Sequence, residues 1–134
     1  WWCFALVETD PEGRKLVLDI AWGDQTVRVF NIYASNDPGE RKLFFRSLRP
    51  LINVNSLLIG DFNTVLSKLD LSRNNVHKSD VSRNELFSLM LDLDVIDVWR
   101  VRNPGKRQFS RRQMVQVLKP LLHKMPDLEV SEKM

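Results

Sequence analysis

The sequence predicts a layered α/β or α+β domain whose strands run in mixed directions. Three strand-like runs come first, then a helix, a buried strand and a second helix. Short turns separate the first three runs, which predicts an antiparallel meander. The order β-β-β-α-β-α is typical of such layered domains. A length of 134 residues fits one domain, and 43% hydrophobic residues are enough for a core.

The first three runs carry strand signals. In the third run Val27 and Val29 point to one face, whereas Phe30 and Ile32 point to the other. This partial alternation suits a strand that is covered on both faces near its end. The strand signals cover residues 2–8, 15–21 and 26–33.

Two helices follow from capping signals. Asp37 is expected to cap the first, with Pro38 at its first helical position, and apolar spacing continues it to about Pro50. Ser82 and Glu85 form a capping box that predicts the start of the second. We also expect a buried strand over 56–60, a packed segment over 95–99, a turn over 103–105, a short strand over 108–110 and an interrupted helix over 115–122.

Composition narrows the class of protein. No stretch approaches the roughly 20 apolar residues that a membrane-spanning helix needs, and the apolar start is too short for a signal peptide. Cys3 is the single cysteine, which rules out an intramolecular disulfide and favours a reducing compartment. We therefore expect an intracellular protein that is not secreted and has no membrane partner. A first residue that is Trp and not Met suggests a segment of a longer protein.

Basic residues crowd one short stretch that contains no acid. The formal charge of +3 is compatible with nucleic-acid binding but does not establish it. Two interpretations stay open for the stretch, namely a solvated basic loop or a contact to a phosphate backbone. Its members are Arg100, Arg102, Lys106, Arg107, Arg111 and Arg112.

Two polar side chains stand at the end of the buried strand. Alternation places Asp61 and Asn63 on one side and Phe62 in the core, and Gly60 permits a close approach of backbone or ligand. A carboxylate can orient a water while a neighbouring amide donates to a phosphate oxygen. In the alternative interpretation, Asp61 caps the following turn and Asn63 bonds the backbone.

The third strand also ends in polar groups. The Tyr33 phenol can donate a hydrogen bond to a phosphodiester oxygen, and the Asn36 amide follows it closely. Alternatively, Tyr33 is a half-buried strand residue whose hydroxyl lies in water. We expect Tyr33, Asn36, Asp61 and Asn63 to face a common pocket that can hold a phosphate.

The order and spacing of these two clusters resemble a known family. The sequence Asn-Ile-Tyr-Ala-Ser-Asn at 31–36, followed after a helix by Leu-Leu-Ile-Gly-Asp-Phe-Asn at 57–63, resembles the endonuclease/exonuclease/phosphatase superfamily. It is most similar to the apurinic-type endonuclease domains that non-LTR (LINE-like) retrotransposons carry ahead of their reverse transcriptase. The resemblance covers residues 2–110. It divides the chain into a core at 1–112, which lacks the N- and C-terminal parts of the family domain, and a divergent tail at 113–134.

The resemblance implies a fold and a reaction. The fold is α+β, a partial four-layer αββα sandwich of the DNase I-like kind with mixed, mostly antiparallel sheets. The reaction is Mg²⁺-dependent phosphodiester hydrolysis by an activated water. Carried over by residue, Asp61 positions or deprotonates the water and Asn63 binds the scissile phosphate or the nucleophile, while Tyr33 and Asn36 contact the phosphate. Asp70 matches the acid of an Asp-Arg-Ser pattern with a DNA contact, although Leu71 replaces its Arg.

Other parts of the family pattern are missing. The metal-binding Glu lies upstream of the first strand seen here, and the closing Ser-Asp-His segment is not found. His77 and His123 match neither part and are interpreted as ordinary solvent-facing histidines. The resemblance therefore leaves the main Mg²⁺ ligands outside this chain, with Asp61 an indirect ligand at most.

Two functions follow as expectations. The first is a Mg²⁺-dependent DNA endonuclease, weak or inactive alone, with DNA as its partner and a reverse transcriptase in the parent polyprotein. Such an enzyme would act in the nucleus. The alternative is a non-catalytic remnant that binds nucleic acid or serves in interactions. A phosphoinositide or small phosphate-ester substrate ranks last, because no basic or aromatic cluster favours an inositol head group.

Overall fold

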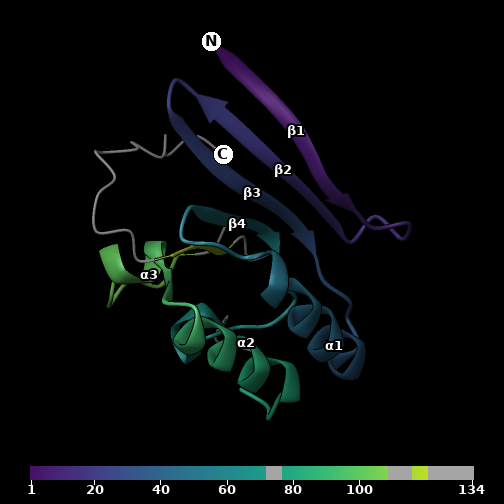
Figure 1. The fold of residues 1–134 in the computed structure, drawn as a ribbon. Coiled ribbons are helices and arrows are strands. Elements are labelled where there is room, and N and C mark those ends of the chain that lie inside the picture. The colour runs from purple at the N-terminus through teal and green to yellow at the C-terminus, as the bar shows by residue number, and fades with distance from the viewer. Residues whose placement is uncertain (72–76, 109–115, 121–134) are drawn as a thin grey trace.

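The computed structural model describes residues 1–71, 77–108 and 116–120, and Figure 1 shows their arrangement. The strands are β1 (Trp2–Thr9), β2 (Lys15–Trp22), β3 (Gln25–Tyr33), β4 (Ser56–Asp61), β5 (Val95–Asp97) and β6 (Gln116–Pro120). The α-helices are α1 (Pro38–Leu48), α2 (Val81–Asp92) and α3 (Val98–Arg102), and single 3₁₀ turns cover Arg49–Leu51 and Lys68–Asp70. None of the described helices has the length and apolar character required to cross a membrane.

The six strands form one mixed sheet in the order β1-β2-β3-β4-β6-β5. β3 and β4 are parallel, whereas the other four neighbouring pairs are antiparallel. The expected meander of the first three strands and the mostly antiparallel character of the sheet are confirmed. Because β3 and β4 run in the same direction, their carboxyl ends lie side by side at one edge. We call this the site edge, and Tyr33 and Asp61 lie there.

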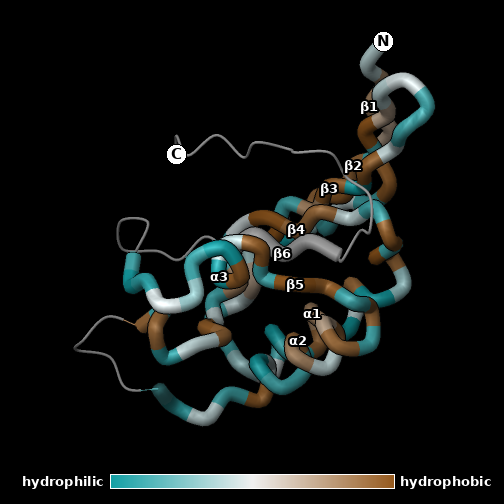
Figure 2. Tube along the Cα trace, turned by 90° about the vertical axis from the view of Figure 1, so that its left-hand side faces the viewer, coloured by the Kyte–Doolittle hydropathy of each residue, from teal (hydrophilic) through white to brown (hydrophobic). Residues whose placement is uncertain are grey.

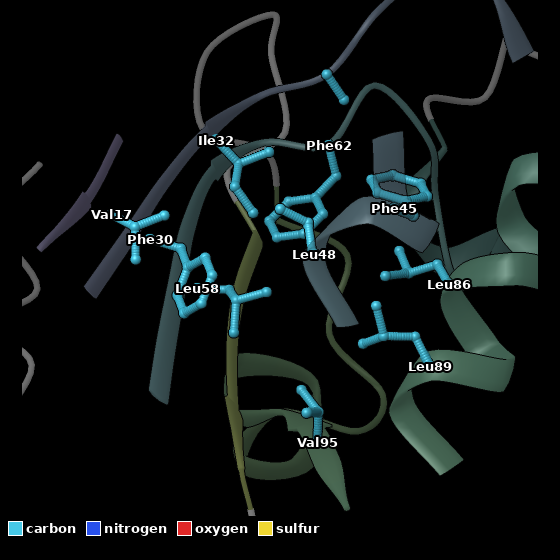
Figure 3. Close-up of a cluster of buried hydrophobic side chains, with 11 residues drawn as sticks. Val17, Phe30, Ile32, Phe45, Leu48, Leu58, Phe62, Leu86, Leu89 and Val95 are labelled. Carbon is cyan, nitrogen blue, oxygen red and sulfur yellow. The ribbon is translucent and has the colours of Figure 1, made fainter. Parts of the chain in front are cut away.

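The core lies between the sheet and two helices. Figures 1 and 2 show α1 and α2 on the same face of the sheet. Figure 3 shows the buried side chains that fill this interface, and each contributes roughly 1.5–3 kcal/mol through burial. They include Phe30, Ile32 and Leu58 from the sheet, Phe45 and Leu48 from α1, and Leu86 and Leu89 from α2.

The opposite face of the sheet is apolar and exposed. Trp2 is paired in register with Trp22, and Phe4 with Ile20, so these side chains share one face. The rings of Trp2 and Trp22 stack with centroids 5.1 Å apart, yet both side chains remain more than half exposed. The α+β class is confirmed, and the described residues supply one sheet and one helical layer of the expected sandwich.

The starts of α1 and α2 each depend on the side chain of an aspartate. The Asp37 carboxylate accepts a hydrogen bond from Glu40 N at 2.8 Å, with Pro38 in the first turn, as predicted. The second helix starts at Val81, because Asp80 accepts from Ser82 N at 2.9 Å. The predicted Ser82 cap is therefore wrong by two positions. Ser82 is instead buried inside the first turn.

The expected helix over 115–122 is wrong where the structure describes it. Residues 116–120 form β6, which pairs with both β4 and β5. The apolar spacing resembled that of a helix, but strand pairing across the sheet satisfies the backbone of β4 and decides the conformation. The segment 95–99 divides into β5 and the start of α3. Of the expected strand at 108–110, only Gln108 is described, and it lies in coil.

Gly60 is required by the parallel pairing of β3 and β4. Its φ is +131°, and a Cβ at this position would lie 2.0 Å from the carbonyl oxygen of Ile32. Since that neighbour is backbone, it cannot turn aside as a side chain would. The close approach expected at Gly60 is confirmed, and the group that approaches it is the adjacent strand.

We expect Gly60→Ala to lower the free energy of unfolding by roughly 2 kcal/mol or more, because it adds backbone strain to a collision with β3. Urea denaturation followed by circular dichroism measures this change. Gly105→Ala is the matched control, since a Cβ there meets nothing within 4 Å. Equal effects of the two substitutions would contradict the prediction.

Candidate functional site

The parallel register brings the ends of β3 and β4 together. Tyr33 is paired with Asp61, and Ala34 N donates a hydrogen bond to the Asp61 carbonyl oxygen at 2.8 Å. Neighbouring strands lie about 4.8 Å apart, and side chains in register point to the same face. The phenol and the carboxylate therefore emerge next to each other, on the face opposite to α1 and α2.

The turn after Asp61 is held by its own polar side chains. Asn63 N donates to Asp61 Oδ1 at 2.9 Å, and Asn63 Nδ2 donates to the Ala34 carbonyl oxygen at 2.6 Å. Asn63 has a φ of +48°, a left-handed conformation that asparagine tolerates better than most residues. The local roles offered as the alternative interpretation are therefore present in the structure.

These local contacts leave part of each group available. Within the described part of the chain, Asp61 Oδ2 and Asn63 Oδ1 have no hydrogen-bond partner. Asp61 and Asn63 are each partly exposed. One oxygen of the carboxylate can thus accept a proton or a hydrogen bond from a ligand while the other holds the turn. The structural and the chemical roles of Asp61 are compatible.

Tyr33 lines an open depression of about 250 Å³ beside the site edge. Its side chain is 53% exposed, so the phenol is accessible to a ligand. Asp61 does not line this depression, which therefore lies next to the carboxylate and does not contain it. The other lining residues are Thr9, Asp10, Gly13, Lys15, Leu16 and Asn31.

Asn36 belongs to the same loop but is held by its backbone. Its carbonyl oxygen accepts a hydrogen bond from Arg41 Nη1 at 3.0 Å, and the residue is exposed. The structure thus brings Tyr33, Asp61 and Asn63 together at the site edge. It leaves Asn36 three residues beyond Tyr33, on the solvent side of the loop.

Arg100 and Asp70 have a placement that differs from the one expected for DNA contacts. They form an ion pair in which the Arg100 side chain is 17% exposed and that of Asp70 is 11% exposed. Arg100 also donates to the carbonyl oxygens of Asn103 and Lys106, at 3.2 Å and 2.9 Å. Both side chains are therefore engaged in joining α3 to the 3₁₀ turn at Lys68–Asp70, and they face away from solvent.

The buried acid beside this pair is Asp97. Its carboxylate caps α3 by accepting from Arg100 N at 2.9 Å. Burial raises the pKa of Asp97, the hydrogen bond from Arg100 N opposes the rise, and the nearby Asp70 carboxylate adds to it. The cluster thus contains two acids and one arginine, which is a further reason why Arg100 is not available to a distant phosphate.

Three of the five remaining basic residues lie within the described part of the chain. Arg102, the last residue of α3, is exposed, and so are Lys106 and Arg107, which follow the helix. Arg111 and Arg112 lie outside the described residues, as does His123. His77 is described and is partly buried. The described part of the basic stretch therefore presents three cations to solvent.

Comparison with known proteins gives a sequence relative and a shared fold. The chain is 36% identical to a protein of Xenopus laevis named the transposon TX1 uncharacterized 149 kDa protein, in an alignment of 103 positions that covers 73% of the chain. The endonuclease domain of TRAS1, a telomere-specific non-LTR retrotransposon, has the same fold with a TM-score of 0.51 and 15% identity over 88% of this chain. No protein-family model matches the chain.

The chain is thus related in sequence to a transposon protein, and it has the fold of a non-LTR retrotransposon endonuclease domain. It spans 8% of the TX1 protein and 56% of the solved TRAS1 domain. A structure of D. rerio TDP2, complexed with a single-strand DNA product, covers 92% of the chain with 13% identity, but its TM-score of 0.48 carries no conclusion. The resemblance stated from the two motifs, and the fold class inferred from it, are thus confirmed.

Sequence reasoning missed the residues that lie behind the site edge. Arg41, Thr64 and Asp80 form a buried polar network that reaches both loops of the site. A signal for Arg41 was present, because it has the same helical spacing as the buried Phe45 and Leu48 and so lies on the apolar stripe of α1. A charged residue on such a stripe is buried and needs partners.

Within the described residues, no group of three or more histidine, cysteine, aspartate or glutamate side chains is arranged to hold a metal ion. Asp61 is the acid nearest to Tyr33 in the strand register. The described residues at the site edge therefore do not form a closed metal cage.

We expect Arg100→Ala to lower the free energy of unfolding by roughly 2–3 kcal/mol, because it leaves the Asp70 carboxylate without its partner. Arg102→Ala removes an exposed arginine from the same helix and should change stability by less than about 0.5 kcal/mol. Parallel urea titrations at neutral pH provide the comparison. A cost of Arg100→Ala as small as that of Arg102→Ala would show that the ion pair does not support the fold.

Proposed function

We propose that the chain forms one side of the active site of a Mg²⁺-dependent endonuclease that hydrolyses DNA phosphodiester bonds. The observation that supports this most is the register of β3 and β4, which places Tyr33 beside Asp61 at the site edge. Similarity to a transposon protein and the fold of a retrotransposon endonuclease domain make DNA the substrate to test first. The chain covers part of its relatives, so we expect it to nick DNA slowly on its own.

The chemistry assigned to this chain begins at Asp61. Its free carboxylate oxygen accepts a proton from a water, and the water oxygen bonds to phosphorus while the bond to the leaving oxygen breaks. The leaving oxygen takes a proton from solvent. Tyr33 donates a hydrogen bond to a non-bridging oxygen, where negative charge grows in the transition state.

Asn63 has two roles in this proposal, one in joining the two loops and one in orienting the reactants. Its Nδ2 already donates to the Ala34 carbonyl oxygen, which fixes the amide plane. The second hydrogen on Nδ2 and the free Oδ1 are then directed by a bond that joins the two loops of the site. An amide held in this way can orient the attacking water or the phosphate.

The described donors fit a Mg²⁺ ion only in part. Magnesium favours six oxygen ligands, commonly one or two carboxylates together with waters and substrate phosphate. Asp61 can hold such an ion through a water, and the described residues contain no cluster of three or more acids, histidines or cysteines that would complete its ligand shell. When bound, Mg²⁺ neutralises charge that develops on the phosphate. The remaining ligands must come from water, from the substrate and from residues beyond those described.

The test is Mg²⁺-dependent nicking of supercoiled plasmid, with EDTA as the negative condition. Asp61→Asn keeps an acceptor for the Asn63 N–H while removing the charge, so it should abolish nicking without unfolding the chain. Tyr33→Phe should lower the rate on the order of tenfold to a hundredfold, because it removes one donor to the developing charge. Asp24→Asn, in the exposed turn between β2 and β3, is the matched control. Nicking that survives Asp61→Asn would exclude this active site.

One observation favours a second function, a non-catalytic module that binds nucleic acid. Arg102 at the end of α3 and Lys106 and Arg107 just after it are exposed, on a segment that the Arg100–Asp70 pair fixes. Cations that contact phosphates release counterions, so their binding weakens as salt rises.

For this second function we expect DNA affinity to fall with salt, and replacement of the three exposed cations by Gln to reduce the slope by roughly 0.9 per lost phosphate contact. Arg111→Gln with Arg112→Gln tests the rest of the basic stretch in the same way. Fluorescence anisotropy with a labelled duplex at several salt concentrations measures both. Asp61→Asn should leave this binding unchanged, and an unaltered slope in every basic variant would rule out the module.

A further inference from the structure

Most of the buried polar side chains described in the structure belong to one network. Burying a polar residue costs free energy unless it is fully hydrogen-bonded. A group of buried polar residues that share hydrogen bonds therefore indicates a specific structural role. Ser56 is the member outside the network, where it serves the turn before β4. The buried polar residues are Ser35, Arg41, Ser56, Thr64 and Ser82.

Arg41, on α1, holds the loop that follows Tyr33. Its Nη1 donates to the carbonyl oxygens of both Ser35 and Asn36 at 3.0 Å. The residue is 4% exposed, so these bonds lie in a water-poor environment where they are comparatively strong. The backbone between Tyr33 and α1 is therefore fixed by a guanidinium group and not by secondary structure.

Asp80, which caps α2, holds the loop that follows Asp61. Its Oδ2 accepts from Thr64 Oγ1 at 2.5 Å and from Arg41 Nη2 at 2.8 Å. Its Oδ1 accepts from the hydroxyl of Ser82 at 2.6 Å, and Arg41 Nε donates to that same hydroxyl at 2.7 Å. Burial raises the pKa of Asp80, but the bonds from Ser82, Thr64 and Arg41 outweigh it and hold the pKa well below the ordinary value.

The Arg41–Asp80 ion pair links the two loops of the site on the side of the helices. Arg41 fixes the Ser35–Asn36 backbone, Asp80 fixes Thr64, and the ion pair between them links the two loops. In front, the loops are connected by Asn63 Nδ2 and the Ala34 carbonyl oxygen. A displacement of either ion-pair partner is thus transmitted to the positions of Tyr33 and Asn63.

We propose that Arg41 and Asp80 are positioning residues of the active site, which set the relative placement of the Tyr33 loop and the Asp61–Asn63 loop. The inference concerns geometry that can be measured without catalysis, and it rests on the proposed function for its effect on turnover. Neither side chain reaches the site edge itself. Both act through the backbone and through Thr64.

The same two helices offer a matched control pair. Arg49 Nη1 donates to Asp92 Oδ2 at 2.7 Å, and Arg49 Nη2 donates to Ser88 Oγ at 3.0 Å. This pair also joins the segment after α1 to α2, but it makes no contact with either loop of the site. Asp92→Asn will therefore show any general effect of weakening the contact between the two helices. It will not show an effect that depends on the positions of the two site loops.

The experiment uses Tyr33 as a probe, since it is the single tyrosine of the sequence. The chain is labelled with 3-fluorotyrosine and with ¹⁵N, and the fluorine resonance of Tyr33 and the side-chain amide resonances of Asn63 are recorded. The variants are Asp80→Asn and Arg41→Lys, with Asp92→Asn and Arg49→Lys as controls. Thr64→Val is added because it removes the hydroxyl bond to Asp80 at nearly constant volume and keeps the ion pair.

We expect Asp80→Asn, Arg41→Lys and Thr64→Val to shift both probes beyond the range set by the parent chain and the two controls. Circular dichroism establishes which variants are folded, and Thr64→Val decides the matter if the other two unfold. Unmoved probes in every folded test variant would overturn the inference.

Plasmid nicking separates this inference from the proposed function. With nicking in the parent chain, the test variants should lose turnover by on the order of tenfold to a hundredfold with little change in KM, and Asp92→Asn should not. A loss in Asp92→Asn equal to that in Asp80→Asn would also overturn the inference. A parent chain that fails to nick would count against the proposed function, while the two resonances would still decide the positioning role.

Discussion

The parallel contact between β3 and β4 is the constraint on which the site depends. Next to its carboxyl end the Gly60 backbone lies so close to Ile32 that a Cβ would come within 2.0 Å of the carbonyl oxygen. One residue farther along, the same register pairs Tyr33 with Asp61. A slip of one position would send either side chain to the opposite face. The glycine and the two polar residues are therefore parts of one arrangement, in which close backbone packing determines where the chemistry can occur.

Buried ion pairs then convert a sheet edge into a defined site. Arg41–Asp80 and Arg100–Asp70 each join segments distant in the sequence, and Asp80 also holds Thr64 in the turn that follows Asp61. Such pairs gain little net stability over well-packed apolar residues, because desolvation offsets the attraction between the charges. A fully bonded network nevertheless specifies one geometry, and two loops without regular structure need such a specification. The charged side chains of these ion pairs therefore mainly hold segments of the chain together, and they are less available to contact a ligand.

The uncovered face of the sheet relates this chain to the larger fold. Trp2, Phe4 and Trp22 expose 60–66% of their surface on one face, which amounts to several hundred Å² when an aromatic side chain presents about 150–250 Å². That area is comparable to the largest apolar patch of a typical monomer, which is about 300–600 Å² and often functional. The four-layer arrangement implied by the resemblance has a second sheet that faces the first, and this apolar face is the surface that such a sheet would cover.

The sequence by itself determined the local features, because these depend on neighbours along the chain. The strand alternation around Phe30, the Asp37 cap and the two site motifs all follow from short-range patterns. The tertiary structure decided what depends on distant partners. It turned residues 116–120 into a strand between β4 and β5, moved the helix cap from Ser82 to Asp80, and drew Arg100 away from solvent to Asp70. Spacing along a chain indicates which face a residue occupies, but the partner that a buried charge or an unpaired strand will find is set by the folded arrangement alone.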